Sequence, residues 1–581
     1  MAPSELTFGI VGSGGDGVLT AGNLLVQSAA RDGLYCFMVK SFGPQIRGGE
    51  SSCRIRVSDE QVLSQGDKLD VLAAFNWNDV VRFQTEIRLT DDAVVLVDEA
   101  EEGEPPEAVE GRRIVKVPIS AISQEQIGAV RSKNMVMIGV LAEACHLPIE
   151  GVRRSVEKKL GRKGPDVVAK NLAAIEAGRS YAKENLADVP IATLEYEPSE
   201  PKILMTGNEA VAYGAIYAGC RFYAGYPITP ATEILQYLAR EMPRFGGVVV
   251  QAEDEISAMG MVIGASFAGK KAMTATSGPG MSLKTEGIGL ACLAEIPSVI
   301  VNVQRAGPST GIPTKTEQAD LQQAIYGTHG DAPRVVVAPS DVEDCFDVTV
   351  ESFYIAEKYQ IPVIILSDQF VGQRIESVNR DGLLSVSGFT AVNKRRKPHR
   401  DELDDYKRFK DTPSGVSPMT WPGIEGGQYA TAGIVHDENG DPSSVMEVHW
   451  KMAGKRSRKF EDISKELQFI RHYGPEDAEI GLIGWGSSKG AIKESVLRAN
   501  AEGYKVQAVI PQIIYPLPQE KIAAFLAPLK KLVVCEVSFS GQFLHYLRSL
   551  LDLPKETYSV SRPGGMPLAI AEIYDRLMEI M

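Results

Sequence analysis

Short apolar strands alternate with helices in three separate parts of this chain, and this alternation constrains its fold more than any other feature. The clearest example is the start, LTFGIVGSGGDGVLTAGNLLVQSAARDG, whose pattern predicts a strand, a glycine loop and a helix. Similar patterns return after residue 203 and again after residue 466. Because strands that alternate with helices form mostly parallel sheets, we expect an α/β, multidomain chain with a doubly wound domain.

Proline-rich and charge-rich stretches separate these parts. We predict α/β domains at 1–186, 203–370 and 466–581, a linker at 187–202 and an extended connection at 371–465. The connection carries many charges and little hydrophobic pattern, so we expect a long surface segment with little core of its own. The total length of 581 residues is consistent with roughly three to five domains.

Composition excludes several classes of protein. The net charge is −14, from 75 acidic and 61 basic residues, which argues against a general binder of nucleic acid or anionic membranes. No stretch has the length and apolarity of a transmembrane helix, and the first residues lack the pattern of a signal peptide, so a cytoplasmic protein is expected. The seven cysteines form no C-x-x-C pair, so we expect reduced core thiols and no metal site in this chain.

A proline-flanked turn and an acidic helix start are the strongest candidates for a chemical site. In Tyr226-Pro227-Ile228-Thr229-Pro230 the two prolines restrict the backbone around Thr229, so its hydroxyl should point in one direction. About one strand later, Glu253-Asp254-Glu255 opens a helix that has no ionisable side chain from Ile256 to Gly269. Favourable helix-dipole interactions could explain one or two of these acids. The charge-free run after them favours a pocket or an interface with a partly desolvated carboxylate, able to share a proton.

Two further loops carry cations after apolar strands. Arg305 follows SVIVNVQ and precedes a Gly-Pro turn, so its guanidinium should emerge at the carboxyl end of a strand and could bind a carboxylate through two hydrogen bonds. Lys40 and Arg47 flank a loop punctuated by glycine and proline after LYCFMV. Such loops bind ligands in α/β proteins, although this pattern alone favours solvated surface charge for the Lys40–Arg47 loop.

Two glycine turns can be read either as ligand loops or as simple turns. Gly12–Gly17 fits G-x-G-x-x-G between a strand and a helix, where phosphate could approach the helix start. A nicotinamide site also requires an acid at the end of the second strand, and that strand ends in Lys40, so NAD binding is disfavoured. Thr276–Gly280 follows KAMTA and could present backbone amides to an anion or a ring edge, or simply turn the chain.

Taken together, these motifs resemble the 2-oxoacid:ferredoxin oxidoreductases. Residues 203–370 resemble the pyrimidine-binding domain of their α subunit through GYPITPATEI, EDEISAMG, TATSGPG and QRAGPSTGIPTKTEQADL. Residues 1–186 resemble the γ domain of the same enzymes through GSGGDG, SFGPQIRGGESS and KNMVMIGVLAEA. The end of the chain, with CEVSFSGQFLHYLRS, resembles the transketolase C-terminal-like domain of the α subunit. The resemblance covers nearly the whole chain apart from 371–465.

The resemblance implies thiamine diphosphate as the cofactor, shared with a β subunit that supplies Mg²⁺ and a [4Fe–4S] cluster. Glu255 then bonds N1′ of the pyrimidine, while Thr229 and Arg305 bind the substrate carboxylate. The implied cofactor-binding residues are Tyr226, Pro227, Ile228, Thr229 and Glu255. The implied reaction is oxidative decarboxylation of a 2-oxoacid to acyl-CoA, with coenzyme A as co-substrate, single electrons passed to ferredoxin, and the reverse. A dimer of αβ heterodimers is expected.

The choice of substrate rests on fewer residues. 2-Oxoglutarate differs from pyruvate by a second carboxylate, and Lys40 and Arg47 offer two cations for it, so 2-oxoglutarate is the preferred substrate. Pyruvate and branched-chain 2-oxoacids stay open as alternatives. Two other hypotheses are a nicotinamide-dependent dehydrogenase, from the glycine loop, and a non-catalytic assembly subunit.

Overall fold

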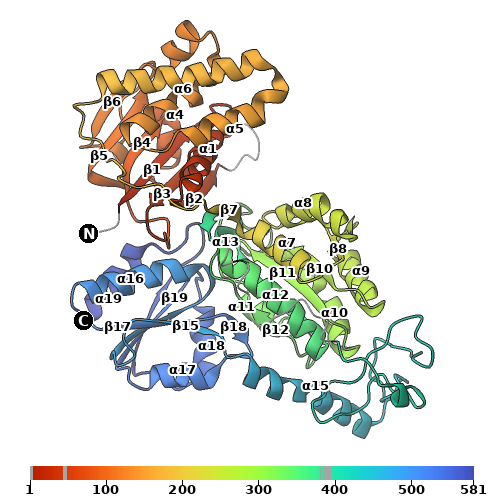
Figure 1. Ribbon diagram of the computed structural model, residues 1–581. Helices are drawn as coiled ribbons and strands as arrows, with labels where there is room; N and C mark the ends of the chain where they lie inside the picture. The colour runs from red at the N-terminus through yellow and green to blue at the C-terminus, as the bar shows by residue number, and fades with distance from the viewer. Residues whose placement is uncertain (1–3, 44–48, 380–382, 384–394) are drawn as a thin grey trace. The chain divides into compact units, whose positions relative to one another are not determined.

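The computed structural model describes residues 4–43, 49–379, 383 and 395–581 (Figure 1). The chain forms two compact units. Unit 1 comprises Met1–Met205 and Arg374–Asp381, and unit 2 comprises Thr206–Gln373 and Gly382–Met581. The segment Arg374–Asp381 therefore belongs to unit 1, although it follows Thr206–Gln373 of unit 2 in the sequence.

Unit 1 contains an 8-stranded sheet in the order β6-β5-β4-β1-β3-β2-β14-β7. The β1–β4, β4–β5 and β5–β6 pairs are parallel, whereas β3 is antiparallel to both β1 and β2, and β14 is antiparallel to β2. The sheet is thus mixed, although the sequence pattern predicted a mostly parallel one. A short connection joins β2 to β3, and strands joined this way pair antiparallel. The strands are β1 (Glu5–Gly12), β2 (Tyr35–Phe42), β3 (Ser51–Ser58), β4 (Leu69–Ala74), β5 (Leu89–Asp98), β6 (Arg113–Val117), β7 (Ile203–Thr206) and β14 (Ile375–Val378).

The helices of unit 1 pack closely through glycine. A Cβ added to Gly139 on α4 would lie 2.0 Å from the carbonyl oxygen of Ile175, and one added to Gly178 on α6 would lie 2.1 Å from that of Val136. Only glycine allows two backbones to approach so closely. The helices of this unit are α1 (Val18–Arg31), α2 (Trp77–Arg82), α3 (Ile119–Ala121), α4 (Lys133–Ala144), α5 (Glu150–Leu160) and α6 (Pro165–Asn185).

Unit 2 contains two sheets. The first has 7 strands in the order β18-β12-β13-β11-β10-β8-β9 and is parallel except for the β12–β18 pair. Its strands are β8 (Phe222–Gly225), β9 (Val248–Gln251), β10 (Ala272–Thr276), β11 (Ser298–Gln304), β12 (Val335–Val337), β13 (Pro362–Asp368) and β18 (Ile513–Tyr515). The accompanying helices are α7 (Gly207–Tyr217), α8 (Thr232–Glu241), α9 (Glu255–Phe267), α10 (Gly278–Leu293), α11 (Leu321–Tyr326), α12 (Val342–Tyr359) and α13 (Gln369–Gln373).

The second sheet of unit 2 has 5 strands in the order β15-β17-β16-β19-β20, parallel except for β15–β17. Its strands are β15 (Ile470–Tyr473), β16 (Ile480–Gly484), β17 (Val506–Pro511), β19 (Lys531–Glu536) and β20 (Glu556–Ser561), with helices α16 (Lys489–Ala501), α17 (Gln519–Leu526), α18 (Gln542–Leu550) and α19 (Ile570–Ile580). One cluster of buried hydrophobic side chains contains Ile300 of β11 together with Val509 of β17 and Trp485, which follows β16. The two sheets of unit 2 therefore share a hydrophobic core.

The connection predicted at 371–465 contains more structure than expected. Its described part leads into a long helix, α15 (Met446–Glu466), which the sequence analysis did not predict. Lys455 and Lys459 on this helix are buried, and both pair with the buried carboxylate of Glu295 at 2.6 and 2.7 Å. The buried guanidinium of Arg408 donates to the main-chain oxygen of Glu295 at 2.6 Å. Charged residues therefore anchor this segment to the rest of unit 2, which explains why it lacks a hydrophobic pattern.

Candidate functional site

The start of α9 holds a buried carboxylate. Asp254 is the N-cap, and its side chain accepts a hydrogen bond from the amide of Ser257 at 2.7 Å. That bond explains one acid of the predicted cluster, because N-cap carboxylates satisfy free helix amides. Glu255 is the first residue of the helix and only 5% exposed. Its carboxylate accepts no hydrogen bond from the residues that the structure describes, so Glu255 is available to bind a ligand.

The first turn of α10 lies against this carboxylate. A Cβ added to Gly280 would lie 2.5 Å from Oε1 of Glu255 and 2.1 Å from Oγ1 of Thr276, so any larger residue here would have to displace these side chains. The Thr276 and Ser277 hydroxyls are buried and have no hydrogen-bond partner among the described residues. The strand-to-helix turn predicted at Thr276–Gly280 is therefore present. It gathers unpartnered polar atoms beside Glu255, which favours the ligand reading over a simple turn.

A buried lysine on α10, which was not predicted from the sequence, also contacts Glu255. Lys284 on α10 is completely buried, and its Nζ donates a 3.0 Å hydrogen bond to the main-chain oxygen of Glu255. Burial lowers the pKa of Lys284 to about 8, although the charges of Glu255 and Asp254 oppose that shift. The sequence does contain a signal, because Lys284 is the only basic residue between Lys271 and Arg305.

The proline turn and Arg305 meet in space. Arg305 follows β11, and its Nη1 donates a 2.7 Å hydrogen bond to the main-chain oxygen of Thr229. Tyr226 is 42% exposed, and Pro227, Ile228 and Thr229 are half-buried. The side chain of Arg305 is 6% exposed, and its Nε is buried without a partner among the described residues. The guanidinium thus retains donors for a further acceptor, as expected for a carboxylate-binding arginine.

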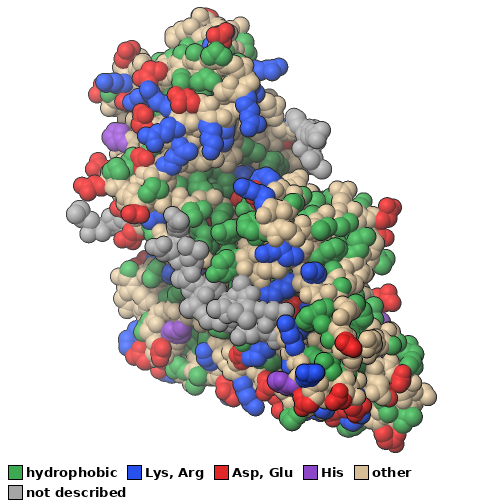
Figure 2. Space-filling view, turned by 45° about the vertical axis from the view of Figure 1, so that its right-hand side comes forward, with side chains coloured by type: hydrophobic (Ala, Val, Ile, Leu, Met, Phe, Trp, Pro, Cys, Tyr) green, Lys and Arg blue, Asp and Glu red, His purple; other side chains and the backbone are tan. Residues whose placement is uncertain are grey.

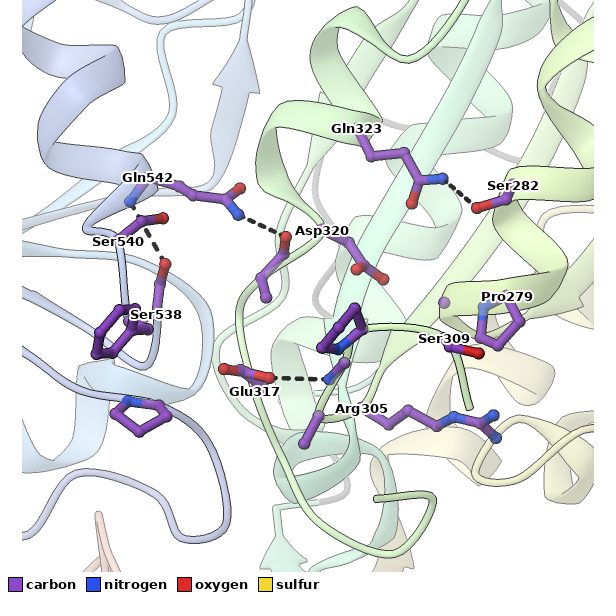
Figure 3. Close-up of a pocket in the computed structure, with 17 residues that line it drawn as sticks. Pro279, Ser282, Arg305, Ser309, Glu317, Asp320, Gln323, Ser538, Ser540 and Gln542 are labelled. Atoms are coloured by element: carbon purple, nitrogen blue, oxygen red, sulfur yellow. Dashed lines mark hydrogen bonds between the residues drawn. The ribbon is translucent and has the colours of Figure 1, made fainter. Parts of the chain in front are cut away.

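Arg305 also lines a cavity of about 610 Å³ within unit 2 (Figure 3). Figure 3 shows Ser538, Ser540 and Gln542 on one side and Arg305, Ser309 and Pro279 on the other. Asp320 and Glu317 lie between them; Asp320 accepts a hydrogen bond from Asn302 at 3.0 Å, and burial raises the pKa of Asp320. Apart from Arg305 and the turn that contains Pro279, none of these residues was proposed from the sequence, because segments far apart in the chain supply them.

The remaining predicted residues belong to unit 1. Lys40 lies in β2, opposite Cys53 of β3, and is half-buried. Arg47 lies outside the described residues. In the glycine loop, the side chain of Asp16 accepts a hydrogen bond from the amide of Ser13 at 2.8 Å. A Cβ on Gly17 would lie 2.5 Å from Nδ2 of Asn134. The glycine loop thus serves close packing within unit 1, in line with the turn reading.

Comparisons with known proteins decide the family. Three family models match: "pyruvate ferredoxin/flavodoxin oxidoreductase" at residues 7–181, "pyruvate flavodoxin/ferredoxin oxidoreductase, thiamine diphosphate-binding" at 213–455 and "pyruvate:ferredoxin oxidoreductase core domain II" at 478–573. The chain is 38% identical to the 2-oxoglutarate synthase subunit KorA of Methanothermobacter marburgensis, over 64% of this chain and 97% of that protein. It is 32% identical to the 2-oxoglutarate oxidoreductase subunit KorA of Mycobacterium tuberculosis, over 97% of this chain and 89% of that protein. The chain belongs to the 2-oxoacid:ferredoxin oxidoreductase α subunits.

A solved member of this 2-oxoacid:ferredoxin oxidoreductase family has the same fold. The 2-oxoglutarate:ferredoxin oxidoreductase of Magnetococcus marinus, with 2-oxoglutarate, coenzyme A and succinyl-CoA bound, matches with a TM-score of 0.93 and 37% identity. The match covers 99% of both chains. The α/β multidomain fold and the oxidoreductase class predicted from the sequence are therefore confirmed.

Helices α9 and α10 of the oxidoreductase α subunit expose hydrophobic side chains. Exposed hydrophobic side chains on α9 and α10 include Ile256, Met261, Leu283 and Leu290, which are 56, 39, 48 and 38% exposed. We call these four residues the α9–α10 face. Figure 2 shows hydrophobic side chains, in green, at the surface of unit 2. None of the described helices is both long and apolar enough to cross a membrane.

Proposed function

We propose that this chain is the α subunit of a thiamine-diphosphate-dependent 2-oxoglutarate:ferredoxin oxidoreductase. It would form succinyl-CoA from 2-oxoglutarate and coenzyme A, with release of CO₂ and transfer of single electrons to ferredoxin, and catalyse the reverse reaction. The observation that carries the proposal is the buried Glu255 carboxylate, which lies against Gly280 in a region matched by the thiamine-diphosphate-binding family model. The relatives at 38% and 37% identity are both named for 2-oxoglutarate.

The residues around Glu255 fit the pyrimidine ring of this cofactor. The ring is flat and carries nitrogen atoms at its edge, and the site offers a glycine surface, two unpartnered hydroxyls and a carboxylate. When bound, thiamine diphosphate supplies the carbanion chemistry that removes CO₂ from a 2-oxoacid. Glu255 would hold a proton between its carboxylate and N1′ of the ring. The remaining proposed contacts come from the turn Tyr226–Thr229.

The substrate carboxylate would be held by Thr229 and Arg305. Their contact at 2.7 Å orients the guanidinium, and its remaining donors can bind a carboxylate through two hydrogen bonds. Lys40 and Arg47 would bind the distal carboxylate of 2-oxoglutarate or part of coenzyme A. Pyruvate and branched-chain 2-oxoacids, which lack that second carboxylate, are the alternative substrates.

A β subunit would complete the site. It would bind the diphosphate through Mg²⁺ and carry a [4Fe–4S] cluster, as the resemblance to these enzymes implies. The α9–α10 face adjoins Glu255 and is apolar, as expected for a subunit interface. We propose a dimer of αβ heterodimers with this face against the β subunit. No observation specifically favours a nicotinamide-dependent enzyme.

The test is to purify the chain with its native partner and measure CoA-dependent reduction of a one-electron dye. We expect activity with 2-oxoglutarate and less with pyruvate. Glu255→Gln should lower kcat by at least about 100-fold without unfolding the complex, a loss typical of a removed proton-transfer group. Thiamine-independent activity, or a Glu255→Gln variant as active as the wild type, would refute the proposal.

A further inference from the structure

A buried lysine beside Glu255 has no role in the chemistry proposed above. The Nζ of Lys284 reaches across from α10 to the main-chain oxygen of Glu255, and among the described residues this is its one hydrogen bond. An ammonium group can donate three hydrogen bonds, and burying it without an ion pair is costly. Nothing in its contacts compensates this cost fully, which points to a function.

The charged groups that act on Lys284 lie together at the start of α9. Among the described residues the groups that act on it are Glu255 and Asp254, both at the start of α9, while Glu286 on its own helix is exposed. Because burial lowers the pKa of Lys284 only to about 8, the side chain is mostly positive at neutral pH. Its charge therefore acts mainly on the first turn of α9, where Glu255 lies.

We propose that Lys284 is a positioning residue that fixes the first turn of α9 and keeps the Glu255 carboxylate negative where the cofactor's pyrimidine binds. This inference rests on the proposed function. A positive charge near the carboxylate favours a shared proton on the ring nitrogen rather than on the carboxylate. We therefore expect one proton to be taken up from solvent when thiamine diphosphate binds and to be shared between Glu255 and the ring nitrogen.

The test measures proton uptake rather than turnover. Thiamine diphosphate with Mg²⁺ is titrated into the cofactor-free αβ complex by calorimetry at about pH 7, in two buffers that differ in ionisation enthalpy. We expect uptake of about one proton per cofactor in the wild type, clearly less in Lys284→Met, and restoration in Lys284→Arg. Lys270→Met, the same change at an exposed lysine after α9, should match the wild type.

Two further readouts exclude a merely structural role. The melting temperature of cofactor-free Lys284→Met should not fall, since an apolar side chain of similar length replaces a buried charge. Its kcat should fall about tenfold, as expected for one partly screened charge, while KM for the 2-oxoacid stays unchanged.

Each outcome has one meaning. Equal proton uptake in Lys284→Met and the wild type would overturn the role of Lys284 and leave the proposed function intact. Proton uptake that persists in Glu255→Gln would also overturn it, because the proton would then reside elsewhere. If the wild-type complex does not bind thiamine diphosphate at all, the proposed function itself fails.

Discussion

At the scale of single residues, the site depends on atoms that a slightly larger side chain would displace. A Cβ added to Gly280 would lie too close to both the Glu255 carboxylate and the Thr276 hydroxyl. Gly278, two residues earlier in the same turn, has only Asp320 at 3.8 Å from an added Cβ, which is an ordinary contact. The two glycines thus form a matched pair, of which only one constrains the carboxylate.

We predict that Gly280→Ala weakens binding of thiamine diphosphate by at least about tenfold and destabilises the chain by about 1–3 kcal/mol, because the added methyl group must displace Glu255. Gly278→Ala should leave the stability within about 0.5 kcal/mol of the wild type. Calorimetric titration of the cofactor and denaturant unfolding check both values. Equal effects of the two substitutions would show that Gly280 does not fit around the carboxylate as described.

At the scale of elements, buried charge holds helix α15 to the rest of unit 2. Burial opposes ionisation of Glu295, but Lys455 and Lys459 outweigh it and lower the pKa of this carboxyl group below its ordinary value. A carboxylate with a lowered pKa in the folded state contributes stability above its ordinary pKa, and this stability is lost as the pH falls. The anchor of α15 should therefore be strong at neutral pH and weaken in acid.

Glu295→Gln should lower the free energy of unfolding by about 3–5 kcal/mol at neutral pH, because Lys455, Lys459 and Arg408 would remain buried without their counter-charge. The difference from the wild type should shrink below about pH 4, in the range where the ordinary carboxyl group titrates. Lys451→Gln on the same helix breaks a partly exposed pair with Glu438 and should cost under about 1 kcal/mol. If Glu295→Gln also costs under about 1 kcal/mol of unfolding free energy, the anchoring role of Glu295 is contradicted.

Helix α12 carries a carboxyl group whose pKa is raised rather than lowered. Burial, together with Asp344 and Asp347, raises the pKa of Glu351 to about 8, and its Oε2 is buried without a partner among the described residues. The folded state binds a proton more tightly than the unfolded state, so stability is lost as the pH rises from about 4.5 to 8. We predict that Glu351→Gln stabilises the chain by about 1–3 kcal/mol above pH 8 and has little effect near pH 4.5. Unfolding curves at both pH values test this, and a pH-independent effect would disprove it.

At the scale of the whole molecule, the α9–α10 face connects the site to assembly. We predict that Leu283→Arg on this face reduces binding of the β subunit at least tenfold, because a charge would be buried in an apolar interface. Leu497→Arg on α16, a similarly exposed leucine at 53%, should bind normally. Co-purification and size-exclusion chromatography measure this. If the Leu283→Arg variant assembles normally, the β subunit does not bind at the α9–α10 face.

Much of this protein was predictable from local pattern. The three α/β parts, the turn at Tyr226–Pro230 and the acid at the mouth of α9 follow from short-range periodicity, proline restriction and helix-start chemistry. The mixed sheet of unit 1 and helix α15 did not, because strand direction depends on which strands pair and α15 is held by buried ions. The predicted boundaries 1–186, 187–202, 203–370, 371–465 and 466–581 stay a proposal.

The sequence by itself determined most of the elements other than α15 and the candidate residues Thr229, Glu255 and Arg305, because local sequence patterns set where strands, turns and helices begin. Only the tertiary structure decided which of them meet. Arg305 reaches Thr229 across 76 positions, and Lys284 reaches Glu255 across 29. Such contacts arise because neighbouring strands in a parallel sheet bring the ends of distant segments to one edge, and strand order is fixed by packing of the whole unit rather than by any local pattern.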